Sequence, residues 1–325
     1  MLRTAIYGMG RWGQTLVNAV QDDSKKIHFT AGVARDPSKY GDFAKEKGFP
    51  VYADYAQVLA DPEIDAVALA TPHSMHAENV QQAAAAGKHV FCEKPFTLTE
   101  ESARASVAAC EKAGVILAVA FNRRYQPAFI ELKKLIDDGR IGKVVHIEGQ
   151  HSGPAGYRDQ PGGWRASKAE NPAGGMCARG LHVLDLMVQC AAPVASVCAI
   201  SDHRVLDTER DDTTAMLLSF RDGASGYLST VMVTGNFWRL HVIGSKGWVE
   251  MRGERRLAVA GLEGEPEIID FDYVDIERAE LEGFADAVAG KTAYPVRYDD
   301  AIHSIAVLES IERSAESGAR VEIPG

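Results

Sequence analysis

Residues 4–20 read TAIYGMGRWGQTLVNAV, and this stretch decides the fold of the first part of the chain. A short apolar run is followed by glycines at 8, 10 and 13, and then by apolar residues three and four positions apart. Such an apolar run is typical of a buried strand. A spacing of three and four positions is typical of the apolar face of a helix. The pattern GxGxxG between a strand and a helix predicts a turn that holds a dinucleotide pyrophosphate at the helix N-terminus. We therefore expect cofactor contacts from Gly8, Met9, Gly10, Arg11, Trp12 and Gly13.

The alternation of strand and helix continues to about residue 122. Apolar runs predict strands at 29–34, 66–70, 89–92 and 115–121, and helical periodicity predicts helices at 75–86 and 99–113. The second of these helices has Thr99 as its expected N-cap and Gly114 just beyond its end. Alternation of this kind predicts a parallel sheet covered on both faces. We expect residues 1–122 to form an α/β Rossmann domain, a doubly wound parallel sheet that binds NAD(P).

The pattern changes after residue 122. A helix is expected at 126–138 and a strand at 144–149; paired strands are expected at 214–220 with 226–233 and at 239–243 with 248–252, and helices at 276–289 and 299–316. Short turns between paired strands predict antiparallel neighbours. We expect residues 123–325 to form an α+β domain with an open, mostly antiparallel sheet, for substrate binding and oligomerisation. The irregular stretch 153–175 is rich in Gly and Pro, and long ordered loops are often functional.

Length, charge and composition narrow the classes of function. The chain has 325 residues, enough for two domains, and 35 Lys plus Arg against 45 Asp plus Glu, a net charge of −10. An acidic protein without basic runs is a poor match for nucleic acid or an anionic membrane. Five cysteines without a CxxC pair predict neither a disulfide scaffold nor a zinc site. We expect a small-molecule substrate and copies of the chain itself as partners.

No apolar stretch approaches the ~20 residues that a bilayer requires. The N-terminal residues run into the first predicted strand without the charged, apolar and cleavage regions of a signal peptide. We therefore expect a cytoplasmic protein.

The residues after the second strand bear on the choice of dinucleotide. An NAD site usually places Asp or Glu there, where it accepts a hydrogen bond from the ribose 2′-hydroxyl. This chain has Arg35, followed by Asp36. A guanidinium suits a 2′-phosphate, so we predict NADP as the cofactor. NAD stays open, because Asp36 could reach back to the ribose while Arg35 remains solvated.

Polar residues follow three of the predicted strands, at the edge where ligands bind in such sheets. They are Thr71, Pro72, His73 and His76 after 66–70; Glu93, Lys94 and Pro95 after 89–92; and Asn122, Arg123, Arg124 and Tyr125 after 115–121. An ammonium at Lys94 could stabilise a developing alkoxide, although a surface ion pair is the alternative. Thr71, Pro72, His76, Glu93 and Lys94 are expected to contact the cofactor. No third ligand accompanies His73 and His76, so we predict no metal site.

These motifs resemble the glucose-fructose oxidoreductase, inositol dehydrogenase and rhizopine-catabolism (Gfo/Idh/MocA) family. The resemblance extends to IGKV at 141–144, to Tyr294, Pro295 and Val296, and to residues 314–323, and so covers nearly the whole chain. It implies an NAD(P)-dependent oxidoreductase acting on sugars, cyclitols or related alcohols. It also implies a Rossmann domain and an open-faced sheet that mediates dimers or tetramers.

The resemblance also assigns roles within GGMCARGLHVLD, residues 174–185. It places His182 on the family's catalytic histidine and Gly180 on its glycine. Ala178 stands where the family has Asp, four residues earlier on the same helix face. Asp185 is expected to serve packing or a buried hydrogen bond. Further predicted contacts are Arg179 for the substrate and Trp164 and Arg165 for the cofactor; each of these charges could instead be solvated.

The predicted reaction is hydride transfer between NADP(H) and a secondary alcohol or its ketone. His182 would take the hydroxyl proton and Lys94 would stabilise the oxygen, with Asn122 and Arg179 as further substrate contacts. A dihydrodiol or a hydroxy acid is an alternative substrate. A dinucleotide-binding sensor without catalysis is the competing class, and Ala178 is its only support.

Overall fold

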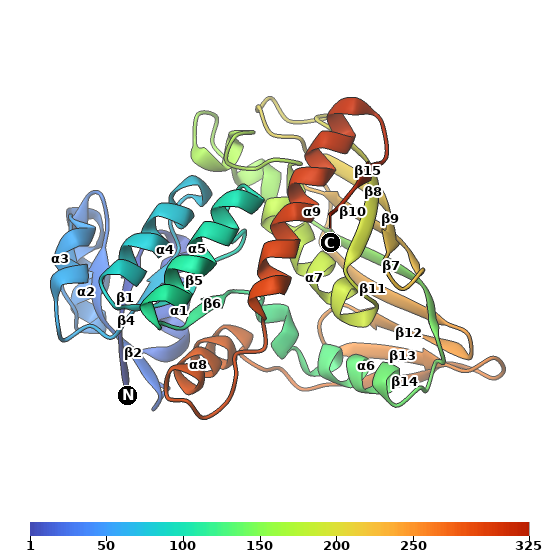
Figure 1. The fold of residues 1–325 in the computed structure, drawn as a ribbon, viewed down its shortest axis with the longest axis horizontal. Coiled ribbons are helices and arrows are strands. Elements are labelled where there is room, and N and C mark those ends of the chain that lie inside the picture. The colour runs from blue at the N-terminus through green and yellow to red at the C-terminus, as the bar shows by residue number, and fades with distance from the viewer. Residues whose placement is uncertain (325) are drawn as a thin grey trace. The chain divides into compact units, whose positions relative to one another are not determined.

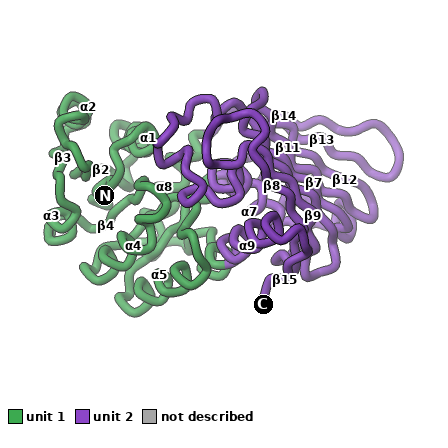
Figure 2. Tube along the Cα trace, turned by 90° about the horizontal axis from the view of Figure 1, so that it is seen from above, with its two compact units in different colours: residues 1–122, 275–302 green, residues 123–274, 303–325 purple. Residues whose placement is uncertain are grey.

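A computed structural model describes residues 1–324, and the chain forms two compact units (Figures 1 and 2). Unit 1 contains residues 1–122 and 275–302, and unit 2 contains residues 123–274 and those from 303 onward. The division at 122 lies where the change of pattern placed it. The segment 275–302 differs from the sequence prediction, because it packs with unit 1 rather than with the second domain.

Unit 1 is built on a parallel sheet, as predicted. Among the described residues its six strands have the order β3-β2-β1-β4-β5-β6. Their bounds are β1 (Leu2–Tyr7), β2 (Ile27–Val33), β3 (Val51–Tyr52), β4 (Ala66–Leu69), β5 (His89–Cys92) and β6 (Leu117–Val119). The chain order reverses between β1 and β4, and such a switch point opens a ligand crevice at the carboxyl ends of the strands.

The helices of unit 1 follow the strands in turn. They are α1 (Arg11–Val20), α2 (Gly41–Lys47), α3 (Tyr55–Ala60), α4 (His76–Ala85), α5 (Glu100–Ala113) and α8 (Ile276–Val288). Thr99 caps α5 as predicted, since its hydroxyl accepts from the Ser102 amide at 3.2 Å, and Gly114 ends the helix at φ +68°. The elements β3, α2 and α3 were not predicted, because two to seven residues are too few to show a periodicity.

The segment 275–302 joins unit 1 through buried contacts. Phe284 of α8 is fully buried, and its ring centroid lies 5.9 Å from that of Phe91 on β5. The Tyr294 hydroxyl donates to the Val119 carbonyl at 3.3 Å, and the Tyr298 hydroxyl accepts from the Leu117 amide at 3.3 Å. A helix and two tyrosines thus complete the first core and cover its edge strand β6.

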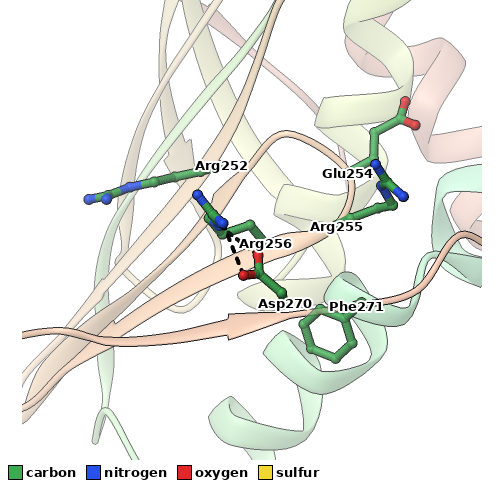
Figure 3. Close-up of a pocket in the computed structure, with 6 residues that line it drawn as sticks. All are labelled: Arg252, Glu254, Arg255, Arg256, Asp270 and Phe271. Carbon is green, nitrogen blue, oxygen red and sulfur yellow. Dashed lines mark hydrogen bonds and ion pairs between the residues drawn. The ribbon is translucent and has the colours of Figure 1, made fainter.

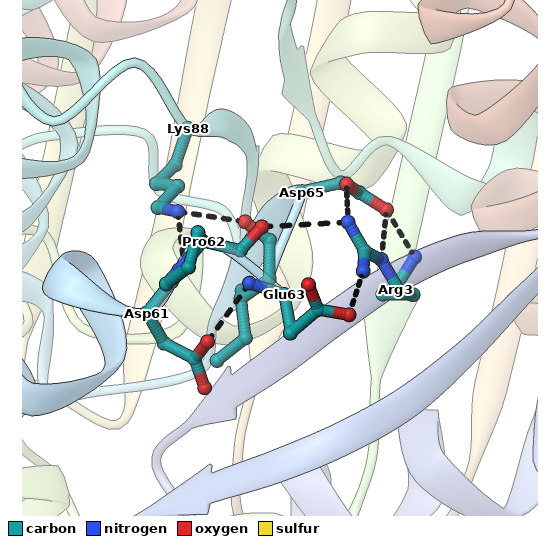
Figure 4. Close-up of polar contacts among 7 residues, drawn as sticks. Arg3, Asp61, Pro62, Glu63, Asp65 and Lys88 are labelled. Atoms are coloured by element: carbon teal, nitrogen blue, oxygen red, sulfur yellow. Dashed lines mark hydrogen bonds and ion pairs between the residues drawn. The ribbon is translucent and has the colours of Figure 1, made fainter.

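Ion pairs and hydrogen bonds fasten the amino ends of the strands (Figure 4). The Arg3 guanidinium binds Asp65 at 2.7 Å and Glu63 at 2.5 Å. The Lys88 ammonium donates to the Asp61 carbonyl at 2.6 Å. This end of the sheet is occupied by structural contacts, which leaves the carboxyl ends of the strands for ligands.

Unit 2 is built on a large mixed sheet. In the described part of the chain its nine strands have the order β14-β13-β12-β11-β7-β10-β9-β8-β15. Their bounds are β7 (Val144–Ser152), β8 (Val194–Asp202), β9 (Thr213–Phe220), β10 (Ser225–Val231), β11 (Phe237–Gly244), β12 (Gly247–Arg252), β13 (Arg256–Ala260), β14 (Glu267–Asp270) and β15 (Val321–Glu322). Among these pairings only β7 with β10 is parallel, so the mostly antiparallel prediction is confirmed.

Helices lie against one face of this sheet. They are α6 (Pro127–Asp137), α7 (Leu181–Cys190) and α9 (Tyr298–Ser317), the last of which begins in unit 1. A Cβ on Gly149 of β7 would lie 2.4 Å from the Val183 side chain, so glycine allows α7 to approach the sheet closely. No helix within residues 1–324 has the length and apolar character needed to cross a bilayer.

Candidate active site

The glycine turn of unit 1 has three distinct steric roles. Gly8 has φ +105°, and a Cβ there would lie 2.4 Å from the Ala70 carbonyl oxygen. A Cβ on Gly13 would lie 1.9 Å from the Gly8 carbonyl oxygen, whereas one on Gly10 would meet no atom within 4 Å. Gly8 and Gly13 therefore permit the tight turn and the close approach of α1, and Gly10 leaves open space for a phosphate. This turn fits a dinucleotide.

The residues between these glycines face different surroundings. The Met9 side chain is buried in the core, so only its backbone can face a ligand, and Arg11 is exposed. The Trp12 indole donates to the Glu93 carboxylate, which links the first turn of α1 to the end of β5. The structure thus brings together two residues that the sequence predicted separately.

Glu93 is a buried carboxyl group with an altered acidity. Burial raises the pKa of Glu93 to about 7, while the positive charge of Lys94 and the Trp12 hydrogen bond act in the opposite direction. The backbone amide of Lys94 also donates to Glu93, at 3.2 Å. Near neutral pH this group therefore exists in both protonation states, which is typical of carboxyl groups in active sites.

Lys94 is half-buried and lies two residues after the end of β5, at the carboxyl edge where ligands bind. Asn122 follows β6; its amide donates to Glu277 of α8 at 3.1 Å, and its carbonyl oxygen is buried without a hydrogen-bond partner in the described residues. The charge of Glu277 also raises the pKa of Glu93. Sequence reasoning missed Glu277, because 155 residues separate it from Asn122 and its helix was assigned to the other domain.

His76 ties two strand ends together. It is fully buried, with Nδ1 2.8 Å from the Pro95 carbonyl oxygen and Nε2 3.1 Å from that of Thr71. Thr71 is itself buried and accepts from the Asn79 amide at 3.3 Å. Both ring nitrogens face backbone carbonyls, so His76 positions the two strand ends; its contact with cofactor or substrate stays a prediction.

Arg35 and Asp36 follow β2 at the same edge of the sheet. Asp36 accepts from the Ser38 hydroxyl at 2.6 Å and pairs with Lys39 at 3.7 Å. The Ser38 hydrogen bond lowers the pKa of Asp36. Arg35 is exposed; burial raises the pKa of Tyr7 at the end of β1, and the positive charge of Arg35 acts in the opposite direction. The Asp36 carboxylate is engaged within its own turn, whereas the Arg35 guanidinium is exposed.

In unit 2, His182 lies near the beginning of α7 and is 7% exposed. A π-helical turn, Met176–Gly180, precedes it, and a Cβ on Gly180 would lie 2.2 Å from the Met176 sulfur. The His182 ring centroid is 6.4 Å from that of His151, which in turn lies 4.9 Å from the Trp238 ring.

His151 and Trp238 were missed by sequence reasoning. They are register partners on β7 and β11, although they lie far apart in the sequence. Their aromatic character next to an irregular loop is the only signal in the sequence. Strand pairing, which is decided in three dimensions, brings them to the candidate histidine.

Asp185 does not take the place of the carboxylate absent at Ala178. It binds the Arg124 guanidinium through two hydrogen bonds, at 2.6 and 2.8 Å, and both side chains are buried. A paired buried carboxylate serves the fold, as predicted for Asp185, and its loss would leave the Arg124 charge buried alone.

Trp164 and Arg165 lie in the irregular loop of unit 2. The Arg165 guanidinium stacks on the Trp164 ring at 4.0 Å. The Asn171 amide donates to the Trp164 carbonyl at 3.0 Å, and Arg210 donates to the Arg165 carbonyl at 2.8 Å. The backbone of this loop is therefore held in one conformation, while its two large side chains form a stacked pair.

A polar surface hollow of unit 2 lies beside β12–β14 (Figure 3). Its lining residues are Arg252, Glu254, Arg255, Arg256, Asp270 and Phe271. Arg256 and Asp270 neutralise each other through two hydrogen bonds, at 2.6 and 2.9 Å. Neither candidate catalytic residue lines this hollow. Within residues 1–324, no three His, Cys, Asp or Glu side chains are grouped as metal ligands.

The fold and the glycine turn define a two-unit, dinucleotide-binding oxidoreductase. Residues 2–121 match the family model described as "Oxidoreductase family, NAD-binding Rossmann fold", and residues 129–250 match "GFO/IDH/MocA C-terminal domain". The chain belongs to the Gfo/Idh/MocA family and is an NAD(P)-dependent oxidoreductase.

Relatives match over nearly the full chain. scyllo-Inositol 2-dehydrogenase (NAD(+)) of Bacillus subtilis is 30% identical, with 99% of this chain and 96% of the relative covered. D-xylose 1-dehydrogenase (NADP(+)) 2 of Haloferax volcanii is also 30% identical, with 95% and 96% covered. The crystal structure of a putative NADPH-dependent oxidoreductase from Desulfitobacterium hafniense superposes with a TM-score of 0.92 at 25% identity, covering 99% and 97%.

Proposed function

We propose that this protein transfers hydride between NADP(H) and a secondary alcohol of a sugar, a cyclitol or a related compound. The observation that carries the proposal is the glycine turn, open at Gly10, with Lys94 after β5, two strands away from β1, at the carboxyl edge of the same sheet. The relatives named as inositol and xylose dehydrogenases support this substrate class. When bound, the nicotinamide ring accepts or supplies the hydride.

The chain's own residues then have separate tasks. His182 accepts the hydroxyl proton in the oxidation direction, and the Lys94 ammonium stabilises negative charge on the same oxygen. Asn122 offers a buried carbonyl oxygen for a substrate hydroxyl. The Trp12 hydrogen bond to Glu93 fixes the glycine turn against the strand end that precedes Lys94.

A sensor that binds the cofactor without catalysis is the second candidate, and Ala178 is the residue that favours it. A panel of polyols with NADP⁺, followed by the absorbance of reduced nicotinamide, separates the two candidates. Oxidation of any of these polyols supports the enzyme. Tight cofactor binding without turnover of the whole panel favours the sensor.

We propose NADP over NAD because of the residues after β2. The Asp36 carboxylate is already bonded to Ser38 and Lys39, whereas Arg35, just after β2, is exposed. An exposed guanidinium can meet a 2′-phosphate with charge-assisted hydrogen bonds.

Arg35→Ala should weaken NADP⁺ binding by about 1.5 to 3 kcal/mol, the range for a charge-assisted contact, and leave NAD⁺ binding nearly unchanged. Titration calorimetry with both cofactors measures the difference. Lys39→Ala is the matched control, because it removes a neighbouring charge that pairs with Asp36. Tighter binding of NAD⁺ than of NADP⁺ by the unmodified protein would refute the assignment.

We propose that the outer face of the unit 2 sheet binds a second copy of the chain. Across β8, β9 and β10, this face exposes Ile200 (75%), Leu217 (62%) and Tyr227 (39%), and Leu217 is the register partner of Tyr227. Next to Tyr227 on the same face lies Glu148 of β7, which pairs with Arg239 of β11 at 2.8 Å. Monomers rarely expose apolar patches above a few hundred Å².

We expect a homodimer or homotetramer in solution, with this face buried. Light scattering at several concentrations measures the mass of the assembly. Leu217→Lys should shift the assembly toward monomer, because the substitution places a charge in the apolar half of the face. A mass of 35.1 kDa at all concentrations for the unmodified protein would contradict the proposal.

We keep the cytoplasm as the proposed location. All five cysteines are free thiols, and Cys198 is exposed. Free thiols are typical of reducing compartments.

A further inference from the structure

We propose that the substrate carries an acidic group, a carboxylate or a phosphate, and that Arg179 binds it with Arg123 and Arg158 in unit 2. This inference rests on the proposed function and narrows its substrate class to acidic sugars or hydroxy acids.

Arg179 is held in place by the backbone and not by a carboxylate. Its Nη1 donates to the Ser152 carbonyl at 3.1 Å. A Cβ on Gly153 would lie 2.8 Å from Arg179 Nη2 and 2.7 Å from Asn236 Oδ1, so glycine leaves room for both side chains. No ion pair joins Arg179 to any Asp or Glu within residues 1–324. The guanidinium is thus oriented, with donors left for another acceptor.

Two further cations act on Arg179. Partial burial and the positive charges of Arg123 and Arg158 lower the pKa of Arg179, and no carboxylate opposes this effect. Arg123 pairs with the exposed Glu254, while Arg158 is exposed and has no ion pair among the described side chains. Three arginines with one carboxylate leave an excess of positive charge, which an anionic ligand would neutralise.

The cluster lies beside the candidate proton acceptor within the same unit. Arg179 lies in the π-helical turn that leads into α7, three positions before His182 in the chain. The Arg123 guanidinium lies 5.7 Å from the Trp238 ring, which contacts His151, which in turn contacts His182. An acidic group held by these arginines would therefore place the rest of a small polyol at the histidine.

A solvated group of surface charges is the alternative explanation. It accounts for Arg158 but not for Arg179, which is half-buried and fixed by a backbone hydrogen bond. Burying a guanidinium is costly unless it is paired and hydrogen-bonded, and an anionic ligand would supply the pairing that the single Ser152 carbonyl does not.

The test compares glucuronate, glucose and glucose 6-phosphate, which share a sugar ring and differ in their charged group. Titration calorimetry is done with the full chain and NADP⁺ present, and oxidation is followed separately by the absorbance of reduced nicotinamide. We expect at least one charged probe to bind more tightly than glucose. Arg179→Ala should weaken the binding of that probe about 10- to 100-fold and leave the binding of glucose and of NADP⁺ nearly unchanged.

Two variants make the result specific. Arg179→Lys keeps the charge but lacks the planar fork, so it should bind the acid with intermediate affinity. Arg204→Ala removes an arginine whose side chain is 69% exposed and pairs with Asp202, and it should leave the binding of all three probes unchanged.

The outcomes separate this inference from the proposed reaction. Acid-selective binding that depends on Arg179, without oxidation of any probe, supports the inference and counts against the dehydrogenase. Oxidation of neutral polyols without a preference for a charged probe supports the dehydrogenase and counts against the inference. Selectivity for glucuronate identifies a carboxylate and selectivity for glucose 6-phosphate a phosphate. Equal or absent binding of charged and neutral probes, or a loss of NADP⁺ binding in Arg179→Ala, overturns the inference.

Discussion

His182→Ala should lower kcat in the oxidation direction about 10²- to 10⁴-fold, because a general base contributes this range when it accepts a proton in the transition state. The dissociation constant of NADP⁺ should change far less, since the proposed role lies in proton transfer. Steady-state kinetics on the best substrate of the polyol panel measure the first quantity, and titration calorimetry the second.

The pH profile distinguishes a base from a structural histidine. In the unmodified protein, kcat/KM for oxidation should fall at acidic pH, because a protonated imidazole cannot accept the hydroxyl proton. His182→Ala should remove this acidic limb from the residual activity. His203→Ala is the matched control, because His203 is exposed on a loop of the same unit. An unchanged acidic limb in His182→Ala would mean that another group takes the proton.

Lys94→Ala should be comparably severe, with a loss in kcat of about 10²- to 10⁴-fold, because no other residue is proposed to stabilise the developing charge. Lys94→Arg keeps a positive charge but changes its position, and should retain only part of the activity. The measurement is steady-state kinetics, with the thermal unfolding midpoint of each variant as a check on folding. Lys112→Ala, an exposed lysine on α5, is the control and should behave as the unmodified protein.

The two variants together test the assignment of roles. Loss of activity in both supports a shared reacting oxygen. Near-native turnover in His182→Ala with an inactive Lys94→Ala would transfer the proton-accepting role to Lys94 or to another group. Native turnover in both would remove the catalytic proposal for this pair.

Local sequence signals were sufficient for much of the fold. The run and glycine spacing at 4–20 predicted β1, the turn and α1, because strand, turn and helix are contiguous and their periodicities differ. The same holds for the cap at Thr99 and the stop at Gly114 around α5. The antiparallel pairs in the second half were predictable because short turns connect them. Lys94 could be placed at a strand end for the same local reason.

Contacts between distant segments were decided only by the tertiary structure. The segment 275–302 belongs to unit 1 because Phe284 packs on Phe91. No local sequence pattern predicts this contact. Glu277 reaches Asn122 across 155 residues, and the pairing of β7 with β11 brings His151 and Trp238 to His182.

The side-chain partners of the candidate residues were likewise decided only by the tertiary structure. The sequence predicts a ligand contact for His76, and only the structure shows that its two ring nitrogens face the Thr71 and Pro95 carbonyls. The sequence predicts a substrate contact for Arg179, and only the structure shows its backbone partner and its cationic neighbours. Periodicity, caps and glycine turns act over a few residues and can be read from the sequence alone. Burial, pairing and charge balance depend on which distant segments meet, and only the folded chain determines that.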